Sequence, residues 1–468
     1  MKVKSPLEIY KLLPQTNCGE CGFDTCMSFA AHILDRSAKI EDCKPLVEQA
    51  KKSKKVAEKL KKLKEMTAPE IDEVIIGKDL KIGGEEVLHR HELTFFNPTA
   101  LFFDVSDIMD EKTIDERCSR VVEYKKFYVG RYLTLDGIAV RSVSNNPDKF
   151  AEVVKKVSGY GKPIVLISLN PDCIKKALDF VTNPLIYAAN EENWKEMLKI
   201  AKKNKVPVVV RSKDLDMLKS LAATFKKYEV PVVLDPVTEP AGRGLQKTFE
   251  RVIQIRRTAI LGQDKDINCP IMVTPISAWA MKADEIAKIY WETVIASLFI
   301  VKYADIMILH SLEPHTIMPI VTLRANIYTD PRTPVQVEPG LRAINNPDRN
   351  SPVLITTNFA LTYYTVESDL QSSGASGWLL VLDTGGLGVE VSVAGGQFTP
   401  EKVKQLMEET KVAEKVDHRY LVIPGLAARL QGALEDEIGW KVLVGPTDSG
   451  RLKAWLEENW PPKKEIKN

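Results

Sequence analysis

The sequence has no long hydrophobic run and almost no net charge, which argues against two broad classes of protein. Its longest apolar run, near residues 295–301, ends at Lys302 and is too short to cross a bilayer. The 65 basic and 63 acidic residues leave a formal net charge of only +2, so the overall balance does not indicate nucleic-acid binding. We therefore expect neither a membrane nor a nucleic-acid partner.

A secretory core is also missing after Met1, where the sequence continues into a polar stretch. Cysteine is scarce outside one region: the chain has seven, an odd number, and four lie within the first 43 residues. This usage is typical of the reducing cytoplasm, so we expect a cytoplasmic protein. The single cysteines Cys118, Cys173 and Cys269 lie in apolar surroundings and are expected to be ordinary buried thiols.

What is present is the composition of a globular protein, with 44% hydrophobic and 27% charged residues over 468 positions. This length predicts two to four domains. We predict an α/β protein with four segments: residues 1–50, a four-cysteine domain; 51–69, a lysine-rich helical linker; 70–326, a β/α barrel of the TIM type; and 327–468, a doubly wound domain.

The four amino-terminal cysteines follow the spacing C-x2-C-x4-C-x16-C, at Cys18, Cys21, Cys26 and Cys43. Four thiolates around one small volume are what a cubane iron–sulfur cluster requires. Gly19 and Gly22 follow two of these positions and let the backbone bend sharply around the sulfurs. Zinc is the alternative, although structural zinc usually has two separated CxxC pairs. The spacing favours an iron–sulfur cluster over zinc, and either over disulfides.

Residues 51–65 are rich in lysine and carry Val56, Leu60 and Leu63 at helical spacing. This pattern predicts a helix with a thin apolar stripe. An exposed tether is the favoured interpretation, and a docking site for an acidic partner is the alternative.

From about residue 70 to residue 326, short apolar runs alternate with charged amphipathic stretches. Seven runs read as strands: 137–140, 164–168, 185–188, 207–210, 231–234, 271–274 and 306–309. Continuous apolar strands separated by helices predict a parallel sheet covered on both faces, and about seven repeats fit a closed barrel. Polar residues follow the strand ends, where they serve either chemistry or loop capping: Asn170, Asn190, Arg211, Asp235, Thr274 and His310.

The last segment repeats a strand–helix order that predicts a doubly wound parallel sheet of about 120 residues. Glycine and small residues follow its strands in three separate loops, at Thr384, Gly385, Gly386, Gly388, Gly425 and Gly445. Ligands bind at this edge of an open α/β sheet. Three loops without bulky side chains favour a broad, flat cofactor, and plain tight turns are the alternative.

Four stretches together carry a resemblance to a known family: residues 17–26 (NCGECGFDTC), 356–364 (TTNFALTYY), 383–387 (DTGGL) and 422–425 (VIPG). The chain resembles the large subunits of corrinoid iron–sulfur proteins, and among them the gamma subunits of archaeal acetyl-CoA decarbonylase/synthase complexes. The likeness extends over essentially the whole chain. The cysteine frame alone is shared with other redox proteins, whereas its combination with the carboxyl-terminal stretches is specific.

The resemblance implies a [4Fe–4S] cluster on the four cysteines and a corrinoid (a cobalt-containing cobamide) held by the carboxyl-terminal domain. Its contacts would come from Thr357, Thr362, Thr384, Gly385, Gly386, Leu387, Gly388, Pro424, Gly425, Gly445 and Pro446. It also implies the activity of a 5-methyltetrahydrosarcinapterin:corrinoid/iron–sulfur protein Co-methyltransferase. A methyl group passes from methyl-tetrahydropterin to Co(I) and then to the acetyl-CoA synthase partner, while the cluster reduces Co(II).

The family forms a heterodimer with a smaller barrel subunit and associates with acetyl-CoA synthase and CO dehydrogenase components, so we expect these partners. The barrel would either bind the pterin or dock a partner, and docking is favoured. Many corrinoid proteins ligate cobalt from below through a DxHxxG motif, which this sequence lacks; Asp417-His418 comes nearest. The rival interpretations are an electron carrier with a flavin in the carboxyl-terminal crevice and a zinc-stabilised scaffold.

Overall fold

The computed structural model describes residues 5–36, 38–89, 92, 95–329 and 334–462. The chain divides into two compact units. The first comprises Met1–Leu88, Thr99–Ile114 and Gly137–His310, and the second comprises His89–Pro98, Asp115–Asp136 and Ser311–Asn468.

The amino-terminal part of the first unit consists of short helices around a small apolar core. They are α1 (Pro6–Tyr10), α2 (Cys26–Leu34), α3 (Lys44–Lys52) and α4 (Lys54–Thr67). The lysine-rich stretch is therefore two helices that meet at Ser53. Val56, Leu60 and Leu63 pack into the core, where Leu63 is fully buried. The apolar stripe of α4 thus helps to stabilise the cysteine-bearing helices, while the segment boundaries stay a prediction.

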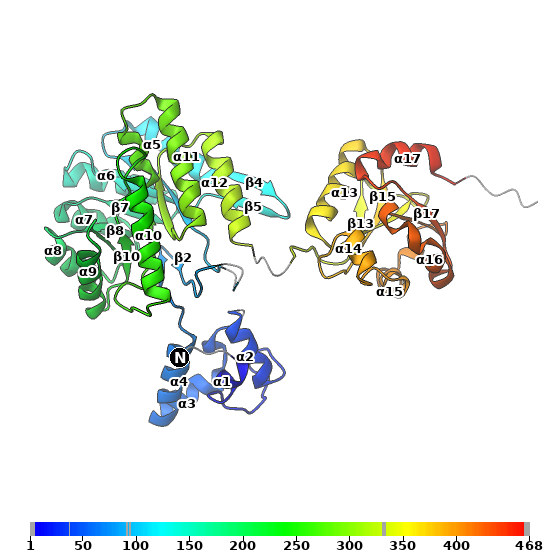
Figure 1. The fold of residues 1–468 in the computed structure, drawn as a ribbon, viewed down its shortest axis with the longest axis horizontal. Coiled ribbons are helices and arrows are strands. Elements are labelled where there is room, and N and C mark those ends of the chain that lie inside the picture. Colours follow the sequence, from blue (N-terminus) through cyan, green and yellow to red (C-terminus); the bar gives the residue numbers. More distant parts are fainter. Residues whose placement is uncertain (1–4, 37, 90–91, 93–94, 330–333, 463–468) are drawn as a thin grey trace, which may run out of the picture. The chain divides into compact units, whose positions relative to one another are not determined.

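The remainder of the first unit is built on eight parallel strands, which confirms the predicted barrel (Figure 1). In the order of the sheet they are β10 (Val232–Asp235), β9 (Val208–Arg211), β8 (Leu185–Ala189), β7 (Ile164–Ile167), β6 (Gly137–Arg141), β3 (Ala100–Ser106), β12 (Ile306–Leu309) and β11 (Met272–Val273). A bridge between Leu234 and Ile271 joins the two ends of the sheet. All seven predicted runs are strands, and β3 is the eighth, which the sequence analysis did not identify.

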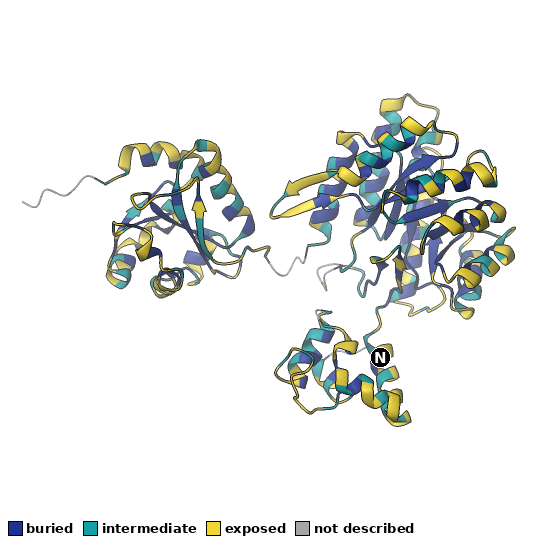
Figure 2. Ribbon diagram, turned by 180° about the vertical axis from the view of Figure 1, so that it is seen from behind, coloured by how far each residue is buried: buried dark blue, intermediate teal, exposed yellow. Residues whose placement is uncertain are grey.

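Helices follow the strands and cover the outside of the sheet. They are α5 (Glu111–Glu123), α6 (Pro147–Ser158), α7 (Pro171–Ala177), α8 (Trp194–Asn204), α9 (Leu215–Lys227), α10 (Leu245–Ile260) and α11 (Glu285–Val301). The strands are buried and the outer helix faces are exposed (Figure 2). The second unit also contains α12 (Pro314–Ile327) and the hairpin of β4 (Lys125–Tyr128) and β5 (Arg131–Thr134).

An antiparallel hairpin, β1 (Glu73–Ile76) and β2 (Leu80–Gly83), closes the amino-terminal end of the barrel. Its backbone bonds to Asn183 and Asn268, which precede β8 and β11. The hairpin contributes three apolar side chains to the core formed by the strands: Val74, Ile76 and Ile82. Apolar packing therefore fills the lower interior, and the open end of the barrel is at the carboxyl ends of the strands, as in other barrels.

The carboxyl-terminal sheet has the order β13-β15-β14-β16-β17 and confirms the doubly wound prediction. Its strands are β13 (Gly340–Ile344), β14 (Val353–Thr357), β15 (Gly377–Leu382), β16 (Tyr420–Ile423) and β17 (Lys441–Val444). All are parallel except β13, an edge strand that was not predicted. One face packs on α13 (Ala360–Ser373) and α17 (Leu452–Asn459), and the other on α14 (Val389–Ala394), α15 (Pro400–Thr410) and α16 (Gln431–Ile438). The chain reverses its winding between β14 and β16, which is the switch point where such sheets bind ligands.

Candidate functional site: a cysteine loop and a carboxyl-terminal crevice

The cysteine loop is held by local backbone geometry. Gly19 and Gly22 have φ angles of +75° and +85°, a region that favours glycine. The N–H of Gly22 donates to the carbonyl of Gly19 at 2.9 Å. Asn17 Oδ1 accepts the N–H of Cys26 at 2.8 Å, which ties the start of the loop to the start of α2. The loop therefore has a fixed shape around its thiols.

The thiols range from exposed to buried: Cys18 is exposed, Cys21 is intermediate, and Cys26 and Cys43 are buried. Burial raises the pKa of Cys43, and the charges of Cys21, Cys26 and Cys18 raise it further. The other three thiols therefore lie near enough to Cys43 to disfavour its thiolate form. A cationic centre would relieve this repulsion, because it stabilises the deprotonated ligands.

Among the described residues, no three Cys, His, Asp or Glu side chains surround a single-ion site. A cubane cluster does not require such an arrangement, because each of its four thiolates binds a different iron atom. The donor set, four thiols and no carboxylate or imidazole, has the chemistry of iron–sulfur ligation.

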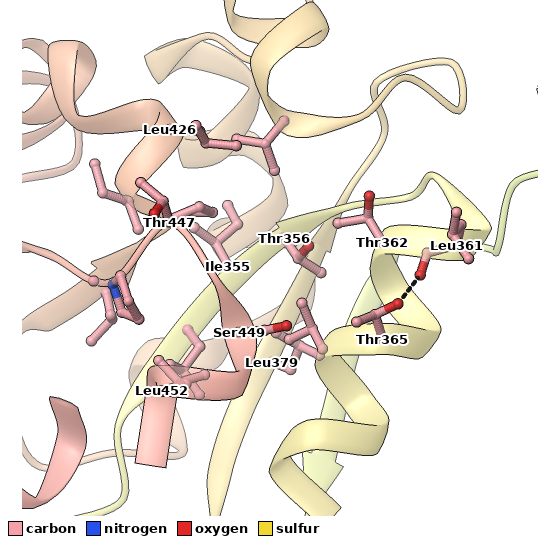
Figure 3. Close-up of a pocket in the computed structure, with 18 residues that line it drawn as sticks. Ile355, Thr356, Leu361, Thr362, Thr365, Leu379, Leu426, Thr447, Ser449 and Leu452 are labelled. Carbon is pink, nitrogen blue, oxygen red and sulfur yellow. Dashed lines mark hydrogen bonds between the residues drawn. The ribbon is translucent and has the colours of Figure 1, made fainter. Parts of the chain in front are cut away.

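A cavity of about 300 Å³ opens at the switch point of the carboxyl-terminal sheet (Figure 3). Its walls come from the ends of β14, β16 and β17 and from the first turns of α13. In Figure 3, Leu361 and Thr362 lie on one side, Leu426 and Thr447 on the other, and Thr356 between them. Two of the three predicted loops, those after β16 and β17, therefore contribute to one concave site, whereas residues 384–388 do not line it.

Two features of this cavity indicate that a ligand is needed to complete it. The hydroxyl of Thr356, which lines the cavity, is buried and has no hydrogen-bond partner among the described residues, and the same holds for its neighbour Thr357, which does not line it. Such orphaned groups are rare in native proteins and cost free energy. Leu361 and Leu426 line the cavity yet are 55% and 45% exposed, so its mouth presents apolar surface to solvent.

The Gly385-Gly386 turn is held by Asn358, a buried residue that the sequence analysis did not propose for the site. Asn358 Oδ1 accepts the N–H groups of Thr384 and Gly386, both at 3.0 Å. Thr384 Oγ1 lies 2.8 Å from the carbonyl oxygen of Leu387 and 3.1 Å from Asn358 Oδ1. The two glycines have φ angles of +66° and +75°, so the turn uses their conformational freedom.

The other two loops touch each other at Gly425. Its N–H donates to the carbonyl of Pro446 at 3.0 Å, and the N–H of Gly445 donates to the carbonyl of Ile423 at 2.9 Å. A Cβ atom on Gly425 would lie 2.9 Å from the carbonyl oxygen of Gly445 and equally close to Thr447. Only glycine permits this approach, which sets one wall of the cavity.

The structure brings some of the eleven predicted corrinoid contacts into the cavity wall and leaves others behind it. Thr362, Pro424, Gly445 and Pro446 line the cavity. The remaining seven are not among its lining residues: Thr357, Thr384, Gly385, Gly386, Leu387, Gly388 and Gly425. The lining residues missed by the sequence analysis come from Thr356, Leu361, Leu426, Thr447 and Ser449, among others. Thr356 and Leu361 were within a quoted stretch, but nothing local distinguished Leu426, Thr447 and Ser449.

His418 lies at the opposite edge of the sheet from the cavity. It precedes β16, whereas Pro424 follows it, and a strand rise of ~3.3 Å per residue separates them by ~20 Å. Its Nε2 donates to the carbonyl of Ser351 at 2.9 Å, and its Nδ1 accepts the N–H of Tyr420 at 3.3 Å. Both ring nitrogens are engaged, so this imidazole is not available as a ligand at the crevice.

Burial lowers the pKa of His418 from its ordinary value, so the folded chain holds it neutral where the unfolded chain would protonate it. Its contribution is present above the unfolded value of about 6.5 and is lost as the pH falls through that value toward the lower folded one. We expect the urea midpoint of the carboxyl-terminal transition to fall between pH 7.5 and pH 5.5. His418→Gln should flatten this dependence, and an equal slope in both proteins would assign it to other groups.

The polar residues predicted at the barrel strand ends have two different roles. Asn170 caps α7 by accepting the N–H of Asp172, and Asn190 accepts the N–H of Asn193, so these two are capping residues. Arg211 instead pairs with the buried Asp235, with 3.4 Å between Nε and Oδ2. Thr274 and His310 line a second cavity at the open end of the barrel.

Among the described residues, no helix is long and apolar enough to cross a membrane.

Solved structures similar to this chain include dihydropteroate synthases. The enzyme from Thermus thermophilus is 16% identical, with a TM-score of 0.38 over 49% of this chain and 95% of that one. The enzyme from Vibrio fischeri is 14% identical, with a TM-score of 0.38 over 50% of this chain and 95% of that one.

Sequence comparison gives a much stronger relationship. Residues 73–456 match the family described as CO dehydrogenase/acetyl-CoA synthase delta subunit, and residues 13–45 match one described as "Putative Fe-S cluster". The gamma subunit of the acetyl-CoA decarbonylase/synthase complex of Archaeoglobus fulgidus is 69% identical, over 99% of this chain and 100% of that protein. Gamma subunit 2 of Methanosarcina thermophila is 55% identical over the same shares, and the Methanopyrus kandleri gamma subunit is 41% identical over 97% of each chain. The chain therefore belongs to the family of acetyl-CoA decarbonylase/synthase gamma subunits.

Proposed function

We propose that this subunit is a corrinoid iron–sulfur methyl carrier. It would accept a methyl group from methyl-tetrahydrosarcinapterin and pass it to the acetyl-CoA-forming component of its complex. The observation that carries the proposal is the crevice at the switch point, with the orphaned hydroxyl of Thr356 and its exposed apolar mouth. Family membership and the cysteine loop support it.

In this proposal the residues of the amino-terminal loop hold a [4Fe–4S] cluster through Cys18, Cys21, Cys26 and Cys43. Cys26 is the first residue of α2, whose N-terminal backbone dipole favours a thiolate there. Cys43 is buried against the same apolar core. This core would keep water from the buried side of the cluster, which influences its reduction potential.

The crevice residues would hold the corrinoid. The volume of about 300 Å³ is at the lower end of ligand pockets, so the cavity would receive a substituent of the cofactor. Leu361 and Leu426 would contact its apolar surface, while Thr356 would supply a hydrogen bond from its orphaned hydroxyl. When bound, the corrinoid supplies a cobalt that takes up and releases the methyl group, and the cluster supplies single electrons.

Anaerobic purification followed by absorption spectroscopy and metal analysis tests the proposal. A corrinoid iron–sulfur protein should contain about four iron atoms and about one cobalt per chain. Flavin absorption in place of corrinoid absorption would favour the electron-carrier alternative. About one zinc per chain without iron or cobalt would favour a scaffold. Co-purification with a smaller barrel subunit would test the proposed heterodimer.

Thr384 is predicted to lie near the lower face of the metal as a steric and hydrogen-bonding neighbour. Its side chain is 1% exposed and its hydroxyl bonds within the loop. Thr384→Ala removes this bond, so we expect a changed cobalt reduction potential and a slower methylation rate. Thr384→Ser keeps the hydroxyl and is the matched control. Unchanged potential and rate in the alanine variant would show that Thr384 has no such role.

A further inference from the structure

The open end of the barrel contains a second cavity, of about 540 Å³, that the cluster and the crevice do not explain. Its lining comes from β6, β7, β8 and β12 and from the loop after β11. This volume is within the ordinary range for small-molecule sites, and the carboxyl ends of barrel strands are where such sites lie.

A buried carboxylate, Asp104, holds two of the side chains that line this cavity. Asp104 is fully buried on β3 and accepts two bonds from Arg141, from Nε and Nη2, each at 2.7 Å. Its other oxygen lies 2.6 Å from Nδ1 of His310. Arg141 and His310 line the cavity with side chains that are 33% and 24% exposed. The acid is thus hidden while the guanidinium and the imidazole face the opening.

A buried carboxylate also fixes the aromatic wall. Glu292 is fully buried; its Oε1 accepts the backbone N–H of His310 at 2.6 Å, and its Oε2 accepts Nε1–H of Trp279 at 3.1 Å. The indole and imidazole rings meet edge to face with their centroids 4.3 Å apart. Both rings are therefore held in fixed orientations at the cavity before any ligand arrives, which reduces the entropy cost of binding.

One polar group in this wall lacks a partner. Ser277 Oγ is buried and has no hydrogen-bond partner among the described residues, although Ser277 lines the cavity. Burying ion pairs and an unpartnered hydroxyl costs desolvation free energy. Apolar side chains of equal volume would stabilise the barrel without this cost. A set of this kind in a cavity indicates binding rather than support of the fold.

We infer that this cavity binds the pterin of the methyl donor. This inference rests on the proposed function, which requires such a donor. A flat heterocycle fits beside Trp279 and the apolar wall of Ile276 and Ile308. Its ring N–H and carbonyl groups can pair with the hydroxyl of Ser277, and the carboxylates of its tail can pair with the guanidinium of Arg141. This assigns pterin binding to the barrel, where docking of a partner was the favoured expectation.

Calorimetric titration of the intact, cofactor-loaded subunit with unmethylated tetrahydrosarcinapterin tests the assignment without any methyl transfer. We expect saturable binding that weakens at least tenfold in His310→Ala. His315→Ala is the matched control, since His315 is exposed on α12, and it should bind as the unchanged protein does. No binding by the unchanged subunit, or equal binding by His310→Ala, would overturn the assignment.

A second variant distinguishes a loss of binding from a loss of folding. Ser277→Val removes the orphaned hydroxyl and adds a methyl group to the cavity, so binding should weaken severalfold while the thermal midpoint is kept or raised. Methylation with methyl iodide needs no pterin site. A subunit that is methylated by this reagent but does not bind pterin would overturn only the barrel assignment. A subunit without corrinoid would overturn the proposed function, while the titration would still report on the barrel.

Discussion

Cys26→Ala is expected to remove the iron–sulfur cluster, with iron falling from about four atoms per chain to near zero. Cys26 begins α2 and lies in the same buried core as Cys43 and Leu63. Its loss leaves Cys18, Cys21 and Cys43, and the charges of the first two raise the pKa of Cys43. If the cluster is bound as proposed, so small a core would depend on it for stability, and the amino-terminal helices should unfold as well. Iron analysis and limited proteolysis measure the two effects.

Cys269→Ala is the matched control for this experiment. Cys269 is a buried thiol outside the cysteine loop, and burial raises its pKa to about 12, so the thiol stays protonated. This variant should keep its iron and the protease resistance of the amino-terminal helices. A Cys26→Ala protein with a full complement of iron would show that the cluster is held by other ligands.

The sequence was sufficient to predict those parts of the structure that depend on residues close together in the chain. The cysteine spacing predicted an iron–sulfur loop in the segment that matches the "Putative Fe-S cluster" family, and the apolar runs identified seven barrel strands. Both signals depend on residues close together in the chain. β3 was missed because Asp104 interrupts an apolar run. That interruption is itself informative: the charged residue inside the strand is the one that holds Arg141 and His310 at the barrel cavity.

The crevice could be predicted only in part, because many of its contacts join residues that are far apart in the chain. Its glycine loops were predicted because φ angles and close approaches leave a mark in the sequence. Asn358 organises one of these loops through hydrogen bonds to residues about 26 positions away, and no spacing rule reveals that. The sequence predicts Leu361 as the start of a helix and places Leu426 between a loop and a helix. Only the fold brings the two side chains to one cavity mouth, where both are exposed.

Gly425→Val is expected to reduce the cobalt content at least tenfold while the domain stays folded. Valine Cβ would stand 2.9 Å from the carbonyl oxygen of Gly445 and from the carbonyl carbon of Pro446. Both contacts are backbone, so the two loops must separate. Overpacking of this kind costs about 1–3 kcal/mol, which a domain with two apolar cores can absorb. The separated loops would then no longer form the cavity wall at Pro424 and Pro446.

Gly432→Ala distinguishes a loop effect from a general effect of adding a side chain to this domain. Gly432 lies in α16, and a Cβ there meets no atom within 4 Å. Alanine in a helix is more favourable than glycine by about 1 kcal/mol, so this variant should be slightly more stable and retain its cobalt. Cobalt content and thermal unfolding should be measured on both variants together. If Gly425→Val is folded and retains cobalt like Gly432→Ala, the contact between the β16 and β17 loops does not shape the corrinoid site, and the cofactor must be held elsewhere.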